Sequence, residues 1–256
     1  MKKALGVHCF TAPGFDTDRF GTFTGEVSRE RDAVNALRMK CIQAMEFYKY
    51  DLAVASEGSF GVHPSLFFVP ADEEWLIFID KKNNLEIITR QISTSTNFHG
   101  EEVENESQLQ ALAHLVLFPS HALIMRKNRN SVEEIIKGIS EWPILEKAFK
   151  DMIQKYGSAY VETDMRAMHN PTRMTVIEST CHQLIEKINT RCPSCNIPGY
   201  GISDVIKGLR CSQCLAATSL PLYYVYQCVK CFHSEERMAS DAIPYANPAY
   251  CDFCNP

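Results

Sequence analysis

The last quarter of the chain carries four Cys-x-x-Cys pairs, Cys192-Pro193-Ser194-Cys195, Cys211-Ser212-Gln213-Cys214, Cys228-Val229-Lys230-Cys231 and Cys251-Asp252-Phe253-Cys254. Fifteen residues separate the first two pairs and nineteen separate the last two, which is the spacing of two-knuckle zinc sites. Each turn points two thiolates at one ion, and two turns complete a tetrahedron without an open position. The pattern therefore predicts two structural zinc ions, with these eight cysteines as ligands.

Each block of two pairs meets the spacing by itself, so we expect sequential sites, with Cys192 and Cys195 beside Cys211 and Cys214, and Cys228 and Cys231 beside Cys251 and Cys254. An interleaved grouping remains open. The segment has no helix-length apolar pattern, so bound metal would supply its folding energy. Residues 191–256 are predicted to form a double zinc ribbon with rubredoxin-like knuckles. The other cysteines, Cys9, Cys41 and Cys181, lie in apolar patterns and are predicted to be core thiols.

Charge and hydropathy narrow the class of protein. The 256 residues carry a formal net charge of −5, and residues 191–256 hold five basic and five acidic side chains. Binders of nucleic acid usually present a basic face, so a nucleic-acid partner is disfavoured. The apolar runs are too short for a membrane span, and the start lacks the pattern of a signal peptide. We expect a cytoplasmic protein, where paired cysteines bind metal rather than form disulfides.

Residues 1–190 interleave helix and strand patterns, which predicts a layered α/β domain followed by the tandem zinc ribbon. Helices are expected over 28–48, 108–117, 131–139, 142–156 and 172–189, and strands over 7–10, 51–55, 66–69, 75–80, 85–92, 122–125 and 159–162.

Two acidic stretches are candidates for catalysis. Glu57 begins a glycine-bearing stretch after a predicted buried strand, where a carboxylate can hold a divalent cation or activate water. The Asp16–Glu26 loop, with Asp18, offers further oxygen ligands. A tight turn with a capping glutamate and a solvated loop are the respective structural alternatives.

The stretch Glu162–Arg173 joins a predicted strand end to a helix start. Asp164 adds a third catalytic candidate. Asn170 or Thr172 can cap the helix, and its free amides together with Arg166 and Arg173 suit an anion such as phosphate. The alternative is capping plus structural ion pairs with Glu162 and Asp164.

The chain resembles a bacterial family catalogued as domain of unknown function 6671. The resemblance covers nearly the whole chain and is carried by Asp16–Glu26, Ala55–Gly61, Thr96–Phe98, Phe118–Ala122, Glu162–Ala167, Asn170–Met174 and the cysteine pairs ending in Cys254-Asn255-Pro256. It implies a strand, a His- and Lys-bearing loop and a helix upstream of Leu5, of which this sequence holds only the end. It implies no known activity.

At the level of fold, residues 51–58 are also similar to the housecleaning nucleotide pyrophosphatases, in which a buried strand after a long helix leads into an acidic, glycine-bearing turn. That similarity implies a metal-ligand or base role for Glu57. We therefore expect a Mg- or Mn-dependent enzyme that processes a small phosphorylated ligand, such as a phosphohydrolase or nucleotide pyrophosphatase. The alternative is a non-catalytic adaptor whose zinc ribbons recruit a protein partner.

Overall fold

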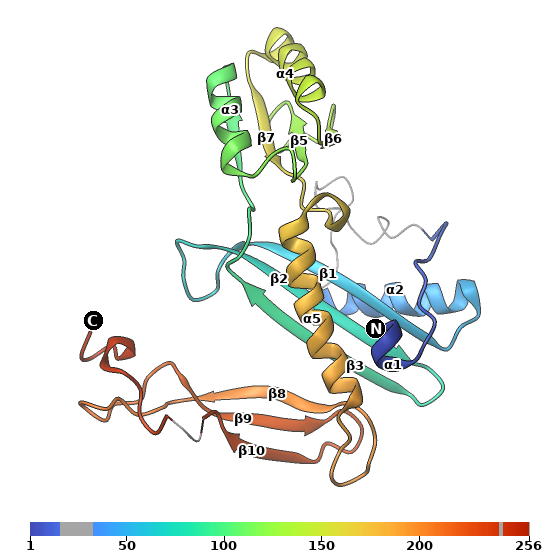
Figure 1. Cartoon of the computed structure of the whole chain (residues 1–256), viewed down its shortest axis with the longest axis vertical. Helices are drawn as coiled ribbons and strands as arrows, with labels where there is room; N and C mark the ends of the chain where they lie inside the picture. Colours follow the sequence, from blue (N-terminus) through green and yellow to red (C-terminus); the bar gives the residue numbers. More distant parts are fainter. Residues whose placement is uncertain (16–32, 241–242, 256) are drawn as a thin grey trace. The chain divides into compact units, whose positions relative to one another are not determined.

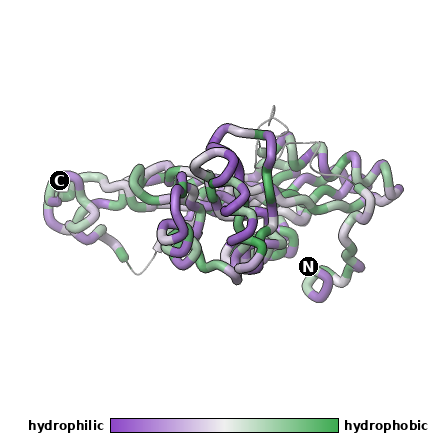
Figure 2. Tube along the Cα trace, turned by 90° about the horizontal axis from the view of Figure 1, so that it is seen from above, coloured by the Kyte–Doolittle hydropathy of each residue, from purple (hydrophilic) through white to green (hydrophobic). Residues whose placement is uncertain are grey.

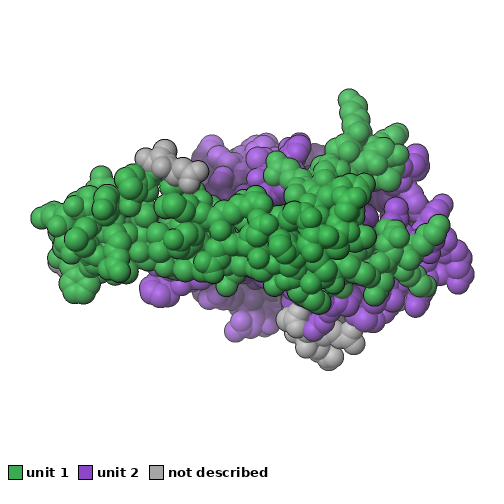
Figure 3. All heavy atoms as spheres, turned by 90° about the horizontal axis from the view of Figure 1, so that it is seen from below, with its two compact units in different colours: residues 1–7, 80–87, 184–256 green, residues 8–79, 88–183 purple. Residues whose placement is uncertain are grey.

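The computed structural model describes residues 1–15, 33–240 and 243–255. The chain divides into two compact units (Figure 3): residues 1–7, 80–87 and 184–256 form unit 1, and residues 8–79 and 88–183 form unit 2. Unit 1 thus contains the whole cysteine-rich segment together with residues 1–7, the turn at residues 80–87 and the end of the helix that stops at Asn189. The boundary after residue 190 stays a prediction.

The first sheet has the order β1-β2-β3, with β1 (Leu52–Val62), β2 (Pro70–Asp80) and β3 (Leu85–Ser93). Its connecting loops are too short for a parallel crossover, so neighbouring strands are antiparallel. Helix α2 (Ala33–Tyr48) packs Leu37 and Cys41 against Ile77 of β2. Helix α5 (Pro171–Asn189) crosses the other face (Figure 1), where the Thr180 hydroxyl donates to Gln91 of β3. Both faces of the sheet are therefore covered.

The second sheet has the order β4-β7-β5-β6 and is antiparallel throughout, with β4 (Gly100–Val103), β5 (Leu123–Arg126), β6 (Ile136–Ile139) and β7 (Ala159–Thr163). Helices α3 (Glu106–Leu115) and α4 (Trp142–Tyr156) pack Leu112 and Leu145 into one core with Met125 and Val161. Asn105 caps α3 by accepting from the Gln108 amide at 3.0 Å, as its short polar side chain favours.

The third sheet lies in unit 1 and has the order β10-β9-β8, with β8 (Tyr200–Lys207), β9 (Pro221–Cys228) and β10 (Ser234–Met238). All neighbours are antiparallel, and the first residue of β8, Tyr200, pairs with the last residue of β9, Cys228. Each strand therefore begins at the end of the sheet where the previous one stops. The mixed α/β architecture followed by a cysteine-rich ribbon confirms the predicted fold class.

The short elements are α1 (Lys2–Leu5), η2 (Ala167–His169) and η3 (Pro248–Tyr250). Hydrophobic and hydrophilic residues alternate at short range along the trace (Figure 2). In the part of the chain that the structure describes, no helix is both long and apolar enough to cross a membrane.

Four predicted elements were wrong. The segment 131–139 is a loop and strand β6 rather than a helix, and Gly138 there has a φ of 71°, which a helix does not use. Residues 66–69 precede β2 instead of forming a strand, and residues 7–10 are not a strand. The strand expected to stop at residue 55 continues to Val62. This last difference moves Glu57 from a turn into a strand.

Candidate metal centres and a buried charged cluster

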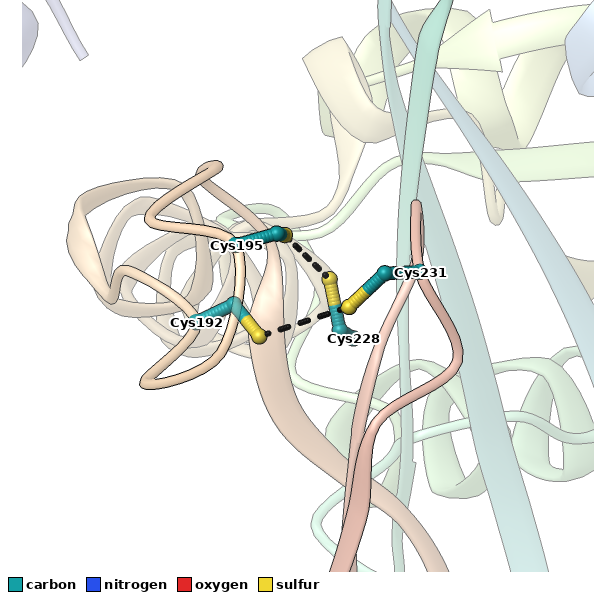
Figure 4. Close-up of side chains that lie close together, drawn as sticks. All are labelled: Cys192, Cys195, Cys228 and Cys231. Carbon is teal, nitrogen blue, oxygen red and sulfur yellow. Dashed lines mark hydrogen bonds between the residues drawn. The ribbon is translucent and has the colours of Figure 1, made fainter.

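The eight paired cysteines form two clusters, and the grouping is interleaved. Cys192 and Cys195 meet Cys228 and Cys231 (Figure 4), whereas Cys211 and Cys214 meet Cys251 and Cys254. In each cluster the four Sγ atoms lie within 4.8 Å of one another. The sequential grouping that the spacing favoured is therefore wrong.

The direction of the strands explains the interleaved order. The first pair precedes β8 and the second follows it, and eight extended residues span about 26 Å, which is far too long for one zinc site. Strand β9 returns to the first end and delivers Cys228 opposite Tyr200. Strand β10 then leads the chain back toward the second pair, where Cys211 and Ala246 form a parallel bridge. Antiparallel pairing thus places alternate cysteine pairs at the same end of the sheet.

Three of the four turns share one backbone pattern. The amides of Ser194, Gln213 and Lys230 donate to the first sulfur of their own pair at 3.3, 3.4 and 3.4 Å. The residue after the second cysteine in these turns is Asn196, Leu215 or Phe232, with φ values of 58°, 61° and 61°. Such left-handed conformations cost energy for large side chains. The turns therefore adopt a costly backbone conformation that directs amide donors at sulfur. Such donors stabilise the thiolate form, which is the form that binds metal.

The sulfur geometry fits a four-coordinate metal. Sγ–Sγ distances are 3.6 Å for Cys192–Cys231 and 3.7 Å for Cys195–Cys228, and 3.8 and 3.5 Å for the corresponding contacts of the other cluster. Zinc–sulfur bonds of about 2.3 Å in a tetrahedron place sulfurs about 3.8 Å apart, whereas a disulfide needs about 2.05 Å. Both groups can hold a metal ion.

The ionisation of the thiols also favours a bound cation. Backbone amides of Cys214 and Gln213 lower the pKa of Cys211 to about 7. Burial opposes ionisation of Cys228, but the amides of Cys231 and Lys230 bring its pKa to about 7. The neighbouring thiols, Cys214 first, raise the pKa of Cys254 to about 12. Four thiolates therefore repel one another unless a cation lies between them.

The remaining cysteines differ in burial. Cys41 is buried in the α2 core, as predicted. Cys181 is half-buried, and Cys9 is exposed, so the prediction of a core thiol was wrong for Cys9. Cys9 lies in a segment without regular structure, where no strand buries it.

Glu57 lies in the middle of β1, and the turn predicted there was wrong. Its carboxylate forms an ion pair with Lys40 of α2, and the two side chains are only 9% and 16% exposed. Side chains alternate between the faces of a strand, so Glu57 shares the α2-facing side with Ala53 and Ala55. Gly58 faces the opposite side, toward Arg173.

Arg173 is buried in the first turn of α5. Its Nε donates to Glu74 Oε1 at 2.6 Å, its Nη1 donates to the Met165 carbonyl at 2.6 Å, and its guanidinium lies 5.1 Å from the Phe60 ring centroid. A Cβ at Gly58 would lie 2.5 Å from both Arg173 Nη2 and Glu74 Oε1. A side chain at this position would therefore clash with the ion pair, which explains why β1 has a glycine here although glycine is unfavourable inside a strand.

The start of α5 is capped from two sides. The Asn170 carbonyl oxygen of the side chain accepts from the Arg173 amide at 3.0 Å, and its amide donates to Asn97 at 2.8 Å. His121 Nε2 lies 3.3 Å from the Thr172 amide and 2.9 Å from Thr172 Oγ1. Burial lowers the pKa of His121, which keeps the ring neutral and able to accept. Two of the helix-terminal amides expected to meet an anion thus have internal partners.

Asp164 is fully buried and pairs with Arg166. Its carboxylate accepts from Arg166 Nη2 at 2.6 Å and from the Gly138 amide at 3.0 Å. The Arg166 side chain remains 37% exposed. The structure therefore presents Asp164 as the orienting partner of a half-exposed arginine.

The predicted site residues come together only in part. The Arg173 contact with Met165 joins the start of α5 to the Asp164–Arg166 segment. Glu57 faces the other side of the sheet with Lys40, and Asp18 lies outside the described residues. The roles proposed for these side chains stay predictions.

Two carboxylates that the sequence did not single out, Asp72 and Glu74, lie at the centre of the cluster. Both side chains are fully buried on β2. The burial of Asp72 and, next, the Glu74 carboxylate raise the pKa of Asp72 to about 7. Burial also raises the pKa of Glu74, against the opposing effect of Arg173. The available signal was the run Asp72-Glu73-Glu74 directly before an apolar strand, since residues two apart share one face.

A family model described as Domain of unknown function (DUF6671) matches residues 40–256 of the chain. No curated protein and no solved structure gives a significant match.

Proposed function

The chain belongs to the DUF6671 family, and from its own side chains we propose that it binds two structural zinc ions, one in each four-cysteine cluster. One observation carries the proposal: four sulfurs at tetrahedral spacing come from knuckles whose amides point at sulfur. Four soft ligands suit zinc and leave no position for a substrate. The ions would stabilise unit 1 by joining the ends of its three strands, without a catalytic step.

Metal analysis of the purified chain tests this proposal. We expect two zinc ions per chain by inductively coupled plasma mass spectrometry, in protein produced with zinc and iron both available. Removal of the metal with a chelator should abolish the folded signals of unit 1 in an NMR spectrum, since structural zinc contributes folding free energy. Fewer than two metal ions per folded chain, or iron in place of zinc, would contradict it.

A second candidate function is a Mg- or Mn-dependent enzyme that processes phosphorylated or nucleotide substrates. The observation that favours it is a set of buried charges on the first sheet, with Glu57 on the α2 side and Asp72, Glu74 and Arg173 on the α5 side, because such costly groups concentrate at functional sites. Arg166 is the better phosphate ligand of the two arginines, since its side chain is 37% exposed whereas Arg173 is 5% exposed. Glu57 would act as a metal ligand or base.

A panel of nucleotides and phosphoesters with Mg2+ or Mn2+ tests the enzyme. We expect turnover by the zinc-loaded protein, and a loss of about 100-fold or more in kcat for Glu57→Gln, as for removal of a general base. Glu178→Gln, at an exposed position of α5, is the control and should retain full turnover. If no substrate of the panel is turned over, this candidate fails. The adaptor alternative is then favoured, because Phe232 and Phe253 beside the knuckles are exposed and could contact a protein partner.

A further inference from the structure

Within residues 33–240, Asp72 has no cationic partner at ion-pair distance, whereas Glu57, Glu73 and Glu74 each have one. Its side chain is fully buried, and within the described part of the chain neither oxygen accepts a hydrogen bond. Glu57 pairs with Lys40, and Glu74 pairs with Arg173. A buried polar atom without a partner is rare in native proteins and calls for a ligand or a proton.

The buried charges that the structure describes around Asp72 do not balance. Among the described residues on the face that meets α5, two buried carboxylates, Asp72 and Glu74, stand against one buried cation, Arg173. An unpaired buried carboxylate costs several kcal/mol in a protein interior. One further positive charge, placed beside Asp72, would remove the deficit.

The oxygen atoms around the deficit suit a metal ion. Asp72 and Glu74 are two residues apart on β2 and project from the same face. Arg173 binds Glu74 mainly through Oε1 at 2.6 Å, and its contact with Oε2 is 3.5 Å long. Both Asp72 oxygens and Glu74 Oε2 can therefore act as ligands, an all-oxygen donor set that hard divalent cations prefer.

We propose that Asp72 and Glu74 bind one hard divalent cation, Mg2+ or Mn2+, in unit 2. The role of this site rests on the second candidate function, because the bound ion would be the cation that the proposed enzyme needs. Binding itself does not require turnover, so the two can fail separately. Arg173 orients Glu74, and Gly58 provides the space that this ion pair occupies.

The test is a titration of the zinc-loaded full chain with Mn2+, in which electron paramagnetic resonance measures the bound Mn2+. With both four-cysteine clusters filled, we expect one Mn2+ per chain. Asp72→Asn keeps the shape of the side chain and removes its charge. Loss of an outer-shell partner of a metal costs about 10- to 100-fold in affinity, so loss of this direct ligand should weaken Mn2+ binding by more than that. Glu73→Gln changes the adjacent carboxylate on the opposite face, where Glu73 pairs with Arg90, and should bind as the parent does.

A second measurement avoids dependence on a variant of the site. Trp75 follows Asp72 by three residues on β2, about 10 Å along a strand. Tb3+, another oxygen-seeking cation, should therefore show luminescence sensitised by tryptophan, and Trp75→Phe should lose it while still binding Mn2+. Loss of emission in Trp142→Phe instead would place the ion elsewhere and overturn the proposal.

The competing explanation is a proton shared between Asp72 and Glu74. In that case the parent protein binds no Mn2+ at millimolar concentration, or Asp72→Asn binds it equally well. Either result overturns the cation site. Bound Mn2+ without turnover on any phosphoester would leave the site standing and remove only the enzyme.

Discussion

The double variant Cys192→Ser, Cys228→Ser should keep one zinc ion per chain, whereas Cys192→Ser, Cys211→Ser should keep none. In the interleaved grouping the first pair of changes falls in one cluster and the second pair falls in both. A sequential grouping predicts the reverse for these two proteins. The two groupings therefore differ by one whole zinc ion per chain in each variant, and the zinc content of the purified variants distinguishes them.

The same variants should differ sharply in folding. Structural zinc provides an apparent binding free energy of about 10–16 kcal/mol in small zinc-binding peptides, and unit 1 has a thin apolar core around Cys192, Tyr200 and Cys228. We expect the variant without zinc to lose the dispersed NMR signals of β8–β10. Cys181→Ser, a half-buried position outside both clusters, is the matched control and should keep two zinc ions. Equal folding of all three proteins would contradict a structural role.

The cysteine pairs show what spacing predicts and where it stops. Spacing identified the eight residues that cluster, because a Cys-x-x-Cys turn is a local structure. It did not identify their grouping, because both arrangements satisfy it. The deciding feature is that residues 200–207 form one strand, and local patterns in that mostly exposed segment do not reveal it.

Unit 2 shows a related limit of prediction from sequence. Gly58 and Gly61 suggested a turn after residue 55, yet β1 continues through both. At Gly58 the reason is the approach of Arg173 and Glu74, residues that are distant in sequence. Likewise, Asp72 and Glu74 precede the strand predicted over 75–80, yet β2 begins at Pro70 and includes both. Partners distant in the sequence, such as Arg173 for Glu74, are not revealed by local patterns.

The long-range partners also changed the meaning of the candidate residues. Arg166, Arg173, Glu57 and Asp164 were chosen as charged groups near element ends. The structure gives each of them an internal counter-ion, and the partners Glu74 and Lys40 come from other elements. A charged residue at an element end is therefore not by itself a ligand site, and the unbalanced group, Asp72, is the sharper candidate.

Arg173→Met should lower the free energy of unfolding by about 3–5 kcal/mol, because it leaves the fully buried Glu74 carboxylate without its counter-ion. The matched control is Arg90→Met on β3, which breaks the pair with Glu73, the residue before Glu74 on β2; the arginine of this pair is 46% exposed. Exposed pairs contribute about 0–1 kcal/mol, so the control should cost little. Urea denaturation of the zinc-loaded proteins at neutral pH measures both.

A further variant separates the buried charge from lost packing. Adding Glu74→Gln to Arg173→Met removes the unpaired carboxylate, so the double variant should recover part of the stability that the single one loses. Packing alone would make the two losses add. Equal destabilisation by Arg90→Met and Arg173→Met would show that burial of the Arg173–Glu74 pair has no special energetic weight, and it would also weaken the case that Asp72 beside them needs a cation.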